Sequence, residues 1–391
     1  MRIYCITKLR GFQRHLLDYF KENNEVIEKK SFYEVSSSIK KSLSRIIRSK
    51  LSDYLGIIMI VKDNTLNNVK DNTLNNVIVF SYNRFVKSQK PYIINLENPT
   101  ALYHYSLARR KTYFGKIKIK KALNKSNLKK IVCISKACYD TFDVLTNNSL
   151  KSKSKLIQIY PLIPDSKLHK KDVEKLARKT EIKCLFISSE FYLKSGKEVI
   201  DAFEILNNTG YDSISIDIIT KIDTIRRTDL VKIKSLSNIR LHEFNLKYKE
   251  LTQFYNNASV MIHLSRQESF GLVVLEALKF GCCLIGTKIY ALSEMIENNH
   301  NGFLVEPKYK FFNDDNLPNQ YVWNNRKQTI YSNYEDRVLI NFIIEKLIYI
   351  NSNRSELYRL CLNSLTKSRN MEFGEKAIKE KWHNVLNTIL K

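Results

Sequence analysis

Short apolar runs alternate with amphipathic stretches along most of the chain. Before a pair of prolines at positions 161 and 164, runs of strand length cover residues 2–7, 55–61, 77–82, 91–96 and 130–135. After the prolines, strand-like runs recur at 182–188, 213–220, 239–244, 259–265, 282–288 and 302–307, and helical periodicity fills the intervals at 197–208, 247–258, 270–280 and 291–299. Apolar strands separated by amphipathic helices are typical of parallel α/β sheets, so the pattern predicts two Rossmann-like domains.

The prolines suggest the domain boundary. We predict an N-terminal Rossmann-like domain over residues 1–160, a C-terminal one over 161–370, and an amphipathic helix over 371–391 that packs back on the N-terminal domain. Lys62–Val69 and Lys70–Val77 are identical octapeptides rich in Asn and Asp, which we interpret as a duplicated surface loop. The polar stretch Lys308–Asp336 predicts a second long loop.

Positive charge is concentrated in the first domain. Of the formal net charge of +26, residues 1–160 carry +20, from 31 Lys and Arg against 11 Asp and Glu. The densest run, Ala108–Lys130, holds ten Lys and Arg and no acidic residue, with aromatic and aliphatic residues between them. Such a segment can lie on an anionic membrane surface, bind nucleic acid or form a solvated basic helix, and its apolar residues favour the membrane.

Membrane-spanning segments and disulfides are not expected. The longest uncharged apolar run, Tyr54–Val61, is far shorter than the ~20 residues of a spanning helix. The first ten residues contain too short an apolar run for a signal peptide. The seven cysteines include no C-x-x-C pair, so we expect buried, reduced thiols. We therefore predict a cytoplasmic protein that can lie peripherally at the inner face of the plasma membrane.

The clearest chemical signal is the segment ESFGLVVLE, Glu268–Glu276. It follows a predicted strand, so the loop lies at the sheet edge where α/β proteins bind ligands, and the helix after Phe270 points its N-terminus at the same edge. That N-terminus favours an anion, and Gly271 allows a ligand to approach the backbone closely. Two carboxylates beside an anion site are suited to accepting hydrogen bonds from hydroxyls. A sugar nucleotide carries hydroxyls on both sides of a diphosphate.

A family resemblance rests on these residues. The stretch His263–Pro307 is similar to the donor-binding region of glycosyltransferase family 4, retaining enzymes of the GT-B fold. Phe186–Leu206 resembles the strand, loop and helix of the same family that bear a Lys before a Gly. The resemblance implies two Rossmann-like domains whose parallel sheets face a central cleft.

The resemblance assigns roles to the matching residues. Glu268 and Lys194 are the expected catalytic pair: the carboxylate contacts the donor sugar near its reacting carbon, and the ammonium neutralises the diphosphate leaving group. Glu276 is expected to accept hydrogen bonds from the ribose hydroxyls. The remaining donor-binding candidates are Ser265, the backbone N–H groups of Phe270, Gly271, Leu272 and Val273, and the base contacts at Leu241 and His242.

One element of the family pattern is missing. Many members carry an Arg, in a Gly-Arg pair, shortly before the Lys, whereas this chain has Ser188, Ser189 and Glu190 there. We hypothesise that Arg266 or Lys288 supplies the second cation. The family's N-terminal domain binds the acceptor, for which the strand ends of the first domain offer these candidates: Glu97, His104 and Ser135.

The sequence thus favours an enzyme. We expect a retaining hexosyltransferase that moves a sugar from a UDP- or GDP-sugar to a glycan or lipid-linked saccharide in surface polysaccharide synthesis. No Asp-x-Asp triplet and no cluster with metal-ligand spacing occurs, so we expect no metal site and no cofactor beyond the sugar nucleotide substrate. The alternatives are a basic nucleic-acid-binding protein and a non-catalytic GT-B partner protein.

Overall fold

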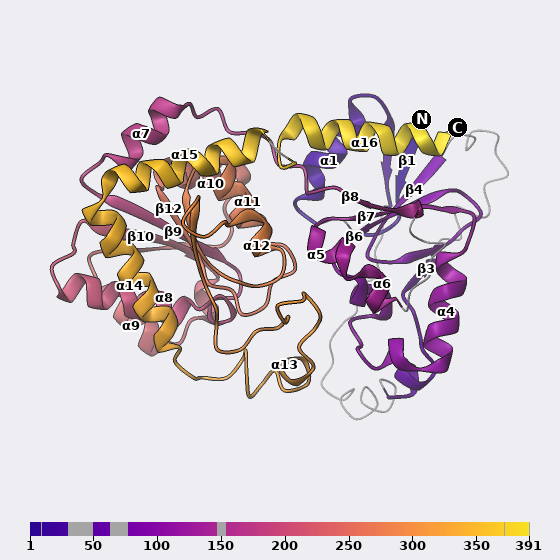
Figure 1. Ribbon diagram of the computed structural model, residues 1–391, viewed down its shortest axis with the longest axis horizontal. Coiled ribbons are helices and arrows are strands. Elements are labelled where there is room, and N and C mark those ends of the chain that lie inside the picture. Colours follow the sequence, from indigo (N-terminus) through magenta and orange to yellow (C-terminus); the bar gives the residue numbers. More distant parts are fainter. Residues whose placement is uncertain (9, 30–49, 63–76, 147–153, 371, 391) are drawn as a thin grey trace. The chain divides into compact units, whose positions relative to one another are not determined.

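The computed structural model describes residues 1–8, 10–29, 50–62, 77–146, 154–370 and 372–390. They form two compact units, which we call unit 1 (Met1–Leu162 with Lys376–Lys391) and unit 2 (Ile163–Glu375) (Figure 1). Each unit is built on a parallel sheet flanked by helices, so the predicted α/β class is confirmed. The units divide between Leu162 and Ile163, beside the proline pair on which the sequence placed its boundary.

Unit 1 contains a six-stranded parallel sheet with the order β2-β1-β4-β6-β7-β8. Its strands are β1 (Arg2–Cys5), β2 (Glu25–Glu28), β4 (Val77–Tyr82), β6 (Tyr92–Leu96), β7 (Leu128–Cys133) and β8 (Leu156–Gln158). A separate parallel pair joins β3 (Ile60–Lys62) to β5 (Phe85–Lys87). The central strands β4 and β6 are buried along their whole length, as their continuous apolar runs require in a sheet covered on both faces.

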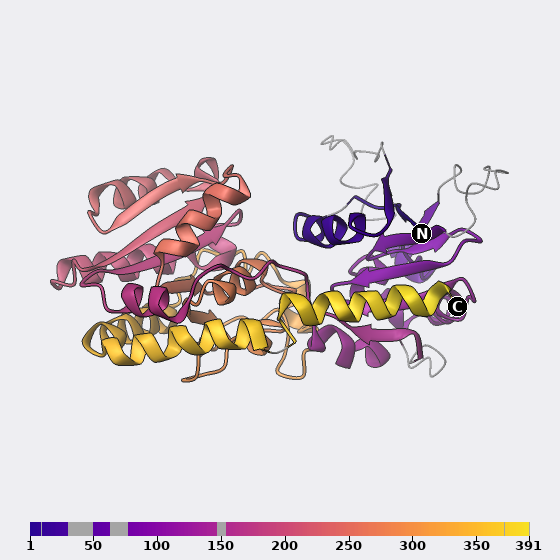
Figure 2. The ribbon, with the colours of Figure 1, turned by 90° about the horizontal axis from the view of Figure 1, so that it is seen from above.

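Helices complete unit 1. They are α1 (Gln13–Lys21), η3 (Pro99–Tyr103), η4 (Arg109–Lys111), α4 (Tyr113–Leu123), α5 (Lys136–Asp140), α6 (Phe142–Leu145) and α16 (Glu375–Leu390). The C-terminal helix α16 lies along unit 1 (Figure 2). Its Trp382 is 1% exposed and meets the rings of Phe20 and Phe80 at centroid distances of 5.4 and 6.0 Å. The last segment of the chain therefore belongs to the core of the first unit.

Unit 2 repeats the architecture with the strand order β11-β10-β9-β12-β13-β14. Its strands are β9 (Ile182–Ser188), β10 (Ile214–Thr220), β11 (Ile239–Glu243), β12 (Val260–His263), β13 (Cys283–Thr287) and β14 (Gly302–Val305). Its helices are α7 (Lys170–Ala177), η6 (Tyr192–Lys194), α8 (Gly196–Asn208), η7 (Ile222–Thr224), α9 (Arg227–Ser235), α10 (Tyr248–Asn257), α11 (Leu272–Lys279), α12 (Leu292–Met295), α13 (Gln320–Asn324), α14 (Arg337–Ser352) and α15 (Arg354–Asn370).

In both sheets the chain adds strands on one side of the first strand and then crosses to its other side. In unit 1 the chain runs from β1 to β2 on one side and returns to β4 on the other. In unit 2 it runs from β9 to β10 and β11, then returns to β12 on the other side of β9. At such a switch point the loops after neighbouring strands diverge and leave a crevice at the carboxyl edge of the sheet, where α/β proteins bind ligands.

Two predicted elements are shorter than the sequence suggested. The strand expected over residues 55–61 is β-structure only from Ile60, because Gly56 turns the chain with φ +57° and lies against the backbone of Gly115, where a Cβ would come within 2.1 Å of a nitrogen. The helix expected over 291–299 ends at Met295, whose carbonyl accepts from the side chain of Asn301 at 2.9 Å. That side chain replaces the next helical hydrogen bond.

Other expectations concern loops, thiols and membrane spans. The polar stretch 308–336 is largely irregular, with α13 as its short helix. Residues 63–76, which hold most of the tandem octapeptides, lie outside the described residues. All seven cysteines are buried and free, as predicted. Across the described parts of the chain, no helix combines the length and apolar character needed to cross a bilayer.

We expect the substitution Trp382→Ala to lower the free energy of unfolding by about 3–5 kcal/mol, because it leaves a large cavity between α16 and the sheet of unit 1. Urea denaturation followed by circular dichroism measures this loss. The matched control is Asn384→Ala on the exposed face of the same helix, which should change stability by less than about 0.5 kcal/mol. Equal effects of the two substitutions would mean that α16 is not part of the core.

Candidate functional site

The switch point of unit 2 brings Lys194 and Glu268 together. Lys194 ends η6, just after β9, and Glu268 lies in the loop after β12. The Nζ of Lys194 lies 2.7 Å from Oε2 of Glu268, and it also donates to Oγ of Ser265 at 2.9 Å and to the carbonyl of Gln267 at 2.7 Å. Two residues separated by 74 positions thus meet at the carboxyl edge of the sheet.

The carboxylate of Glu268 is held ionised. Burial alone would raise its pKa, but the Lys194 ammonium and the hydrogen bond from His263 more than offset burial, so the pKa lies well below its usual range. His263 Nε2 lies 3.0 Å from Oε2, and the N–H of Ser269 donates to Oε1 at 3.1 Å. Burial lowers the pKa of His263, so its neutral ring donates to the carboxylate. The sequence assigned no role to His263, although a histidine within the buried strand β12 was a signal.

The N-terminus of α11 faces the same edge. Its N-cap, Gly271, has φ +90°, and a Cβ there would lie 2.4 Å from the side chain of Leu292. Only glycine fits this turn without displacing α12. The N–H groups of Leu272 and Val273 belong to the first helical turn and precede its first internal hydrogen bond, made by Val274 to the Gly271 carbonyl at 3.0 Å. This end of the helix therefore offers donors and a positive dipole to an anion.

Glu276 lies one helical turn further along. Its Oε2 accepts a hydrogen bond of 2.6 Å from the hydroxyl of Tyr255. Burial raises the pKa of Glu276 to about 7, and the hydrogen bond from Tyr255 lowers it by less than burial raises it. Burial, and then the nearby Glu276, raise the pKa of Tyr248 to about 12. Glu276 is thus the titratable group of this helix near neutral pH.

The structure gives Arg266, one of our two candidates for a second phosphate-binding cation, a different partner. Its guanidinium is 3% exposed and forms an ion pair with Glu198, whose side chain is 1% exposed. It also donates to the Tyr192 carbonyl at 3.2 Å and lies 4.6 Å from the Tyr334 ring centroid. A buried carboxylate requires a buried partner, and Arg266 is engaged there. The other suggested substitute, Lys288, pairs with Glu306 at 3.4 Å on the surface.

The predicted base contacts lie elsewhere along the sheet edge. Leu241 and His242 are in β11, which β10 separates from β9. The ring of His242 bonds to Oδ1 of Asp217 at 2.8 Å and packs edge-on against Phe254 at 4.7 Å. The structure therefore gives the His242 side chain a partner and leaves its backbone as the candidate contact.

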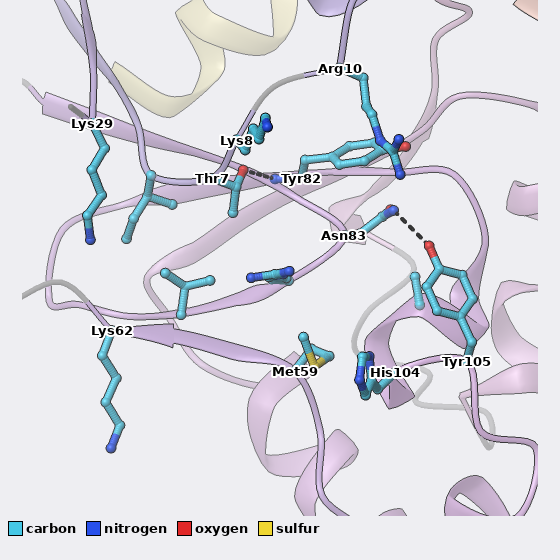
Figure 3. A pocket seen from close by; sticks show the side chains of 14 residues that line it. Thr7, Lys8, Arg10, Lys29, Met59, Lys62, Tyr82, Asn83, His104 and Tyr105 are labelled. Carbon is cyan, nitrogen blue, oxygen red and sulfur yellow. Dashed lines mark hydrogen bonds between the residues drawn. The ribbon is translucent and has the colours of Figure 1, made fainter. Parts of the chain in front are cut away.

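The three acceptor-side candidates lie in different surroundings. His104 lines a cavity in unit 1 (Figure 3), and the carboxylate of Glu97 accepts hydrogen bonds from the hydroxyls of Tyr82 and Tyr105, which line the same cavity. Ser135 is fully buried and caps α5 by accepting from the Cys138 N–H at 3.0 Å. Ser135 is therefore a structural cap and does not line the cavity.

Comparisons with known proteins cover the region that contains this site. Residues 169–317 match the family model described as "Glycosyl transferases group 1". An N-acetyl-α-D-glucosaminyl L-malate synthase of Bacillus anthracis is 24% identical over 170 residues, 41% of this chain and 43% of its own. The GtfA subunit of a UDP-N-acetylglucosamine–peptide N-acetylglucosaminyltransferase of Streptococcus agalactiae is 30% identical over 144 residues, 35% of this chain and 27% of its own. The chain thus spans less than half the length of these relatives.

Solved structures extend the fold likeness to the whole chain. The Anabaena protein HepE, solved with UDP and glucose, superposes with a TM-score of 0.57 at 12% identity, covering 99% of this chain and 100% of its own. WaaG, a glycosyltransferase involved in lipopolysaccharide biosynthesis, gives a TM-score of 0.59 at 12% identity, with 99% of both chains covered. At this identity the likeness establishes the fold. The region of residues 169–317 in unit 2 is thus similar to the group 1 glycosyltransferases, and with a parallel sheet in each unit the chain has the GT-B fold.

Proposed function

We propose that the chain is a retaining hexosyltransferase, which moves a sugar from a UDP- or GDP-sugar to a glycan or lipid-linked saccharide in surface polysaccharide synthesis. The observation that carries this proposal is the Lys194–Glu268 pair, 2.7 Å apart, at the switch point beside the N-terminus of α11. Together they offer a cation, a carboxylate and helical N–H groups at one sheet edge. A nucleoside diphosphate sugar presents the complementary anion and hydroxyls.

Each group has a task in the proposed reaction. The ammonium of Lys194 and the N–H groups of Leu272 and Val273 stabilise the diphosphate, whose charge grows as its bond to the sugar breaks. Glu268 stays ionised and accepts hydrogen bonds from the donor sugar. As the acceptor oxygen bonds to the anomeric carbon, its proton passes to the leaving phosphate oxygen. Lysine and the helix N-terminus supply the positive charge, so the reaction proceeds without a metal ion or cofactor.

The comparisons support uracil as the base of the donor. The Streptococcus agalactiae relative takes its name from UDP-N-acetylglucosamine, and the Anabaena structure holds UDP. Glu276, beside the anion site, is placed to accept hydrogen bonds from the ribose hydroxyls, and the backbone of Leu241 and His242 is proposed to contact the base. These contacts would bind the nucleotide, leaving Lys194 and Glu268 to the reacting atoms.

The acceptor domain is proposed to work at the cytoplasmic face of an anionic membrane. In unit 1, Tyr54 and Tyr113 are 66% and 74% exposed, and both contact Phe114 at ring distances of 6.1 and 5.8 Å. Ile117, which lies on α4 with Tyr113 and Phe114, is also exposed. Apart from Tyr54, this apolar patch lies within the basic run Ala108–Lys130, so lysines accompany aromatic side chains that can enter the headgroup region.

The substitution Lys194→Ala should lower kcat for sugar transfer by about 10²–10³-fold and change donor affinity much less, because the diphosphate charge develops in the transition state. Steady-state kinetics with the active UDP-sugar separate the two effects. Lys234→Ala, an exposed lysine of α9, is the control and should retain wild-type kinetics. A loss confined to KM would contradict the leaving-group role.

Nucleotide binding should depend on pH through Glu276. Its pKa is about 7 in the free protein, and ribose hydroxyls that donate to the carboxylate favour the ionised form, so binding releases a proton. UDP should therefore bind about tenfold more tightly at pH 8 than at pH 6, with the affinity levelling off above pH 7. Calorimetry with Glu276→Gln as the control isolates this term from the titration of UDP itself. The same pH profile in both proteins would remove Glu276 from the nucleotide site.

The membrane proposal predicts co-sedimentation with phosphatidylglycerol vesicles, little with neutral vesicles, and weakening as salt rises. Replacing Lys116, Lys118, Lys120 and Lys121 with Gln should release much of the bound protein and leave UDP affinity unchanged. The charge-matched control replaces four exposed lysines of unit 2 with Gln: Lys170, Lys171, Lys175 and Lys179. Equal release by both sets, or equal binding to neutral vesicles, would refute docking through the basic run.

A further inference from the structure

A cavity of about 610 Å³ lies in unit 1 at the carboxyl edge of its sheet (Figure 3). Its walls come from the segments after β1, β2 and β4, from β3 with the residues before it, and from the end of η3. This is the switch point of unit 1, where the loops after β1 and β4 diverge, and the volume is in the ~300–1,000 Å³ range of small-molecule sites. The cavity therefore lies at the sheet edge where the strand order predicts a ligand-binding crevice.

The cavity is lined by cations. Among its 14 lining residues there is no Asp or Glu, and five are Lys or Arg: Lys8, Arg10, Lys29, Lys62 and Arg84. Within the described residues, four of these form no ion pair with a carboxylate: Lys8, Arg10, Lys62 and Arg84. Some lysines elsewhere have such partners; Lys232, for example, pairs with Asp201 and Glu204 at 2.9 and 2.6 Å. Like charges that share a cavity repel one another, and a bound anion would relieve that repulsion.

The opposite wall is polar and held in an uncommon conformation. Figure 3 shows Lys29 and Lys62 on one side of the cavity and His104 and Tyr105 on the other. Asn83, His104 and Tyr105 have φ of 58°, 56° and 57°, three of the seven non-glycine residues with positive φ in the described chain. Residues that are not glycine adopt this conformation rarely, and such backbone clusters at functional sites.

Hydrogen bonds fix this polar wall. The Asn83 side chain donates to the Tyr105 hydroxyl at 3.4 Å and accepts from the Glu97 N–H at 3.0 Å. The hydroxyls of Tyr105 and Tyr82 both donate to the Glu97 carboxylate behind the wall. One carboxylate thus orients the two tyrosines and offsets only part of the positive charge of the lining.

We propose that this cavity binds the acceptor through at least two negative charges, carried by a phosphate group or by two carboxylates, with Lys62, Arg84 and Arg10 as its main charge partners. Asn83 and Tyr105, which lie across the cavity from Lys62, face the acceptor's hydroxyls (Figure 3). Naming the ligand as the acceptor rests on the proposed function, whereas anion binding by the cavity does not. The substrate class is therefore an anionic saccharide or small anionic alcohol.

The test uses calorimetric titration of the full chain, saturated with UDP, with inorganic pyrophosphate and with malate. UDP binding is measured first, and its absence would refute the proposed function while the anion titrations remain interpretable. The double variant Lys62→Gln/Arg84→Gln should weaken binding of the preferred anion about tenfold or more, through the loss of charge-assisted hydrogen bonds. Its UDP affinity should stay at the wild-type value.

The charge-matched control is Lys87→Gln/Lys129→Gln, two exposed lysines of unit 1 that do not line the cavity. It should weaken anion binding by less than about threefold. A preference for pyrophosphate would assign a phosphate group to the acceptor, and a preference for malate would assign carboxylates. Equal losses in the two double variants, or no binding of either anion by the wild type, would overturn the proposal.

Discussion

The ion pair between Lys194 and Glu268 connects two loops that the sheet alone would leave apart. Lys194 also holds Ser265 and the Gln267 carbonyl, so one ammonium defines the shape of the loop between β12 and α11. In the free protein the Glu268 carboxylate is paired with the Lys194 ammonium, which the diphosphate is proposed to contact. Donor binding would then exchange one anionic partner for another, which keeps Lys194 compensated and positioned before substrate arrives.

The two units share one architecture but differ in the charged groups at the carboxyl edges of their sheets. Each sheet reverses at its first strand and carries its functional groups at the carboxyl edge. In unit 2 a single cation, Lys194, is balanced by the Glu268 carboxylate, at the same edge as the N-terminus of α11. In unit 1 five cations line the corresponding edge without an acidic lining residue. The uneven charge along the sequence therefore reflects, in part, a difference between two binding edges.

The meeting of Lys194 with the Glu268 segment was predictable from sequence because its signals are local. Glu268, Gly271 and Glu276 lie within one strand–loop–helix segment, and parallel topology alone brings the Lys194 loop to the same edge. The ion pair of Arg266 was not predictable, because its partner Glu198 is 68 positions away and is buried in α8. The cationic cavity has no motif either: its walls come from separate segments that only the folded sheet assembles. The capping role of Ser135 was not distinguishable in the sequence either, since a serine after a strand can line a site or cap the next helix.

Titration calorimetry with a panel of sugar nucleotides, in the presence of EDTA, tests the central claim most directly. The account predicts that one UDP- or GDP-sugar binds with a dissociation constant in the range of roughly 1 μM to 1 mM, as substrates commonly do. The chelator should leave that affinity unchanged, because Lys194 and the N-terminus of α11 supply the positive charge for the diphosphate. Failure of every sugar nucleotide to bind, or binding only when Mg²⁺ or Mn²⁺ is restored, would contradict it.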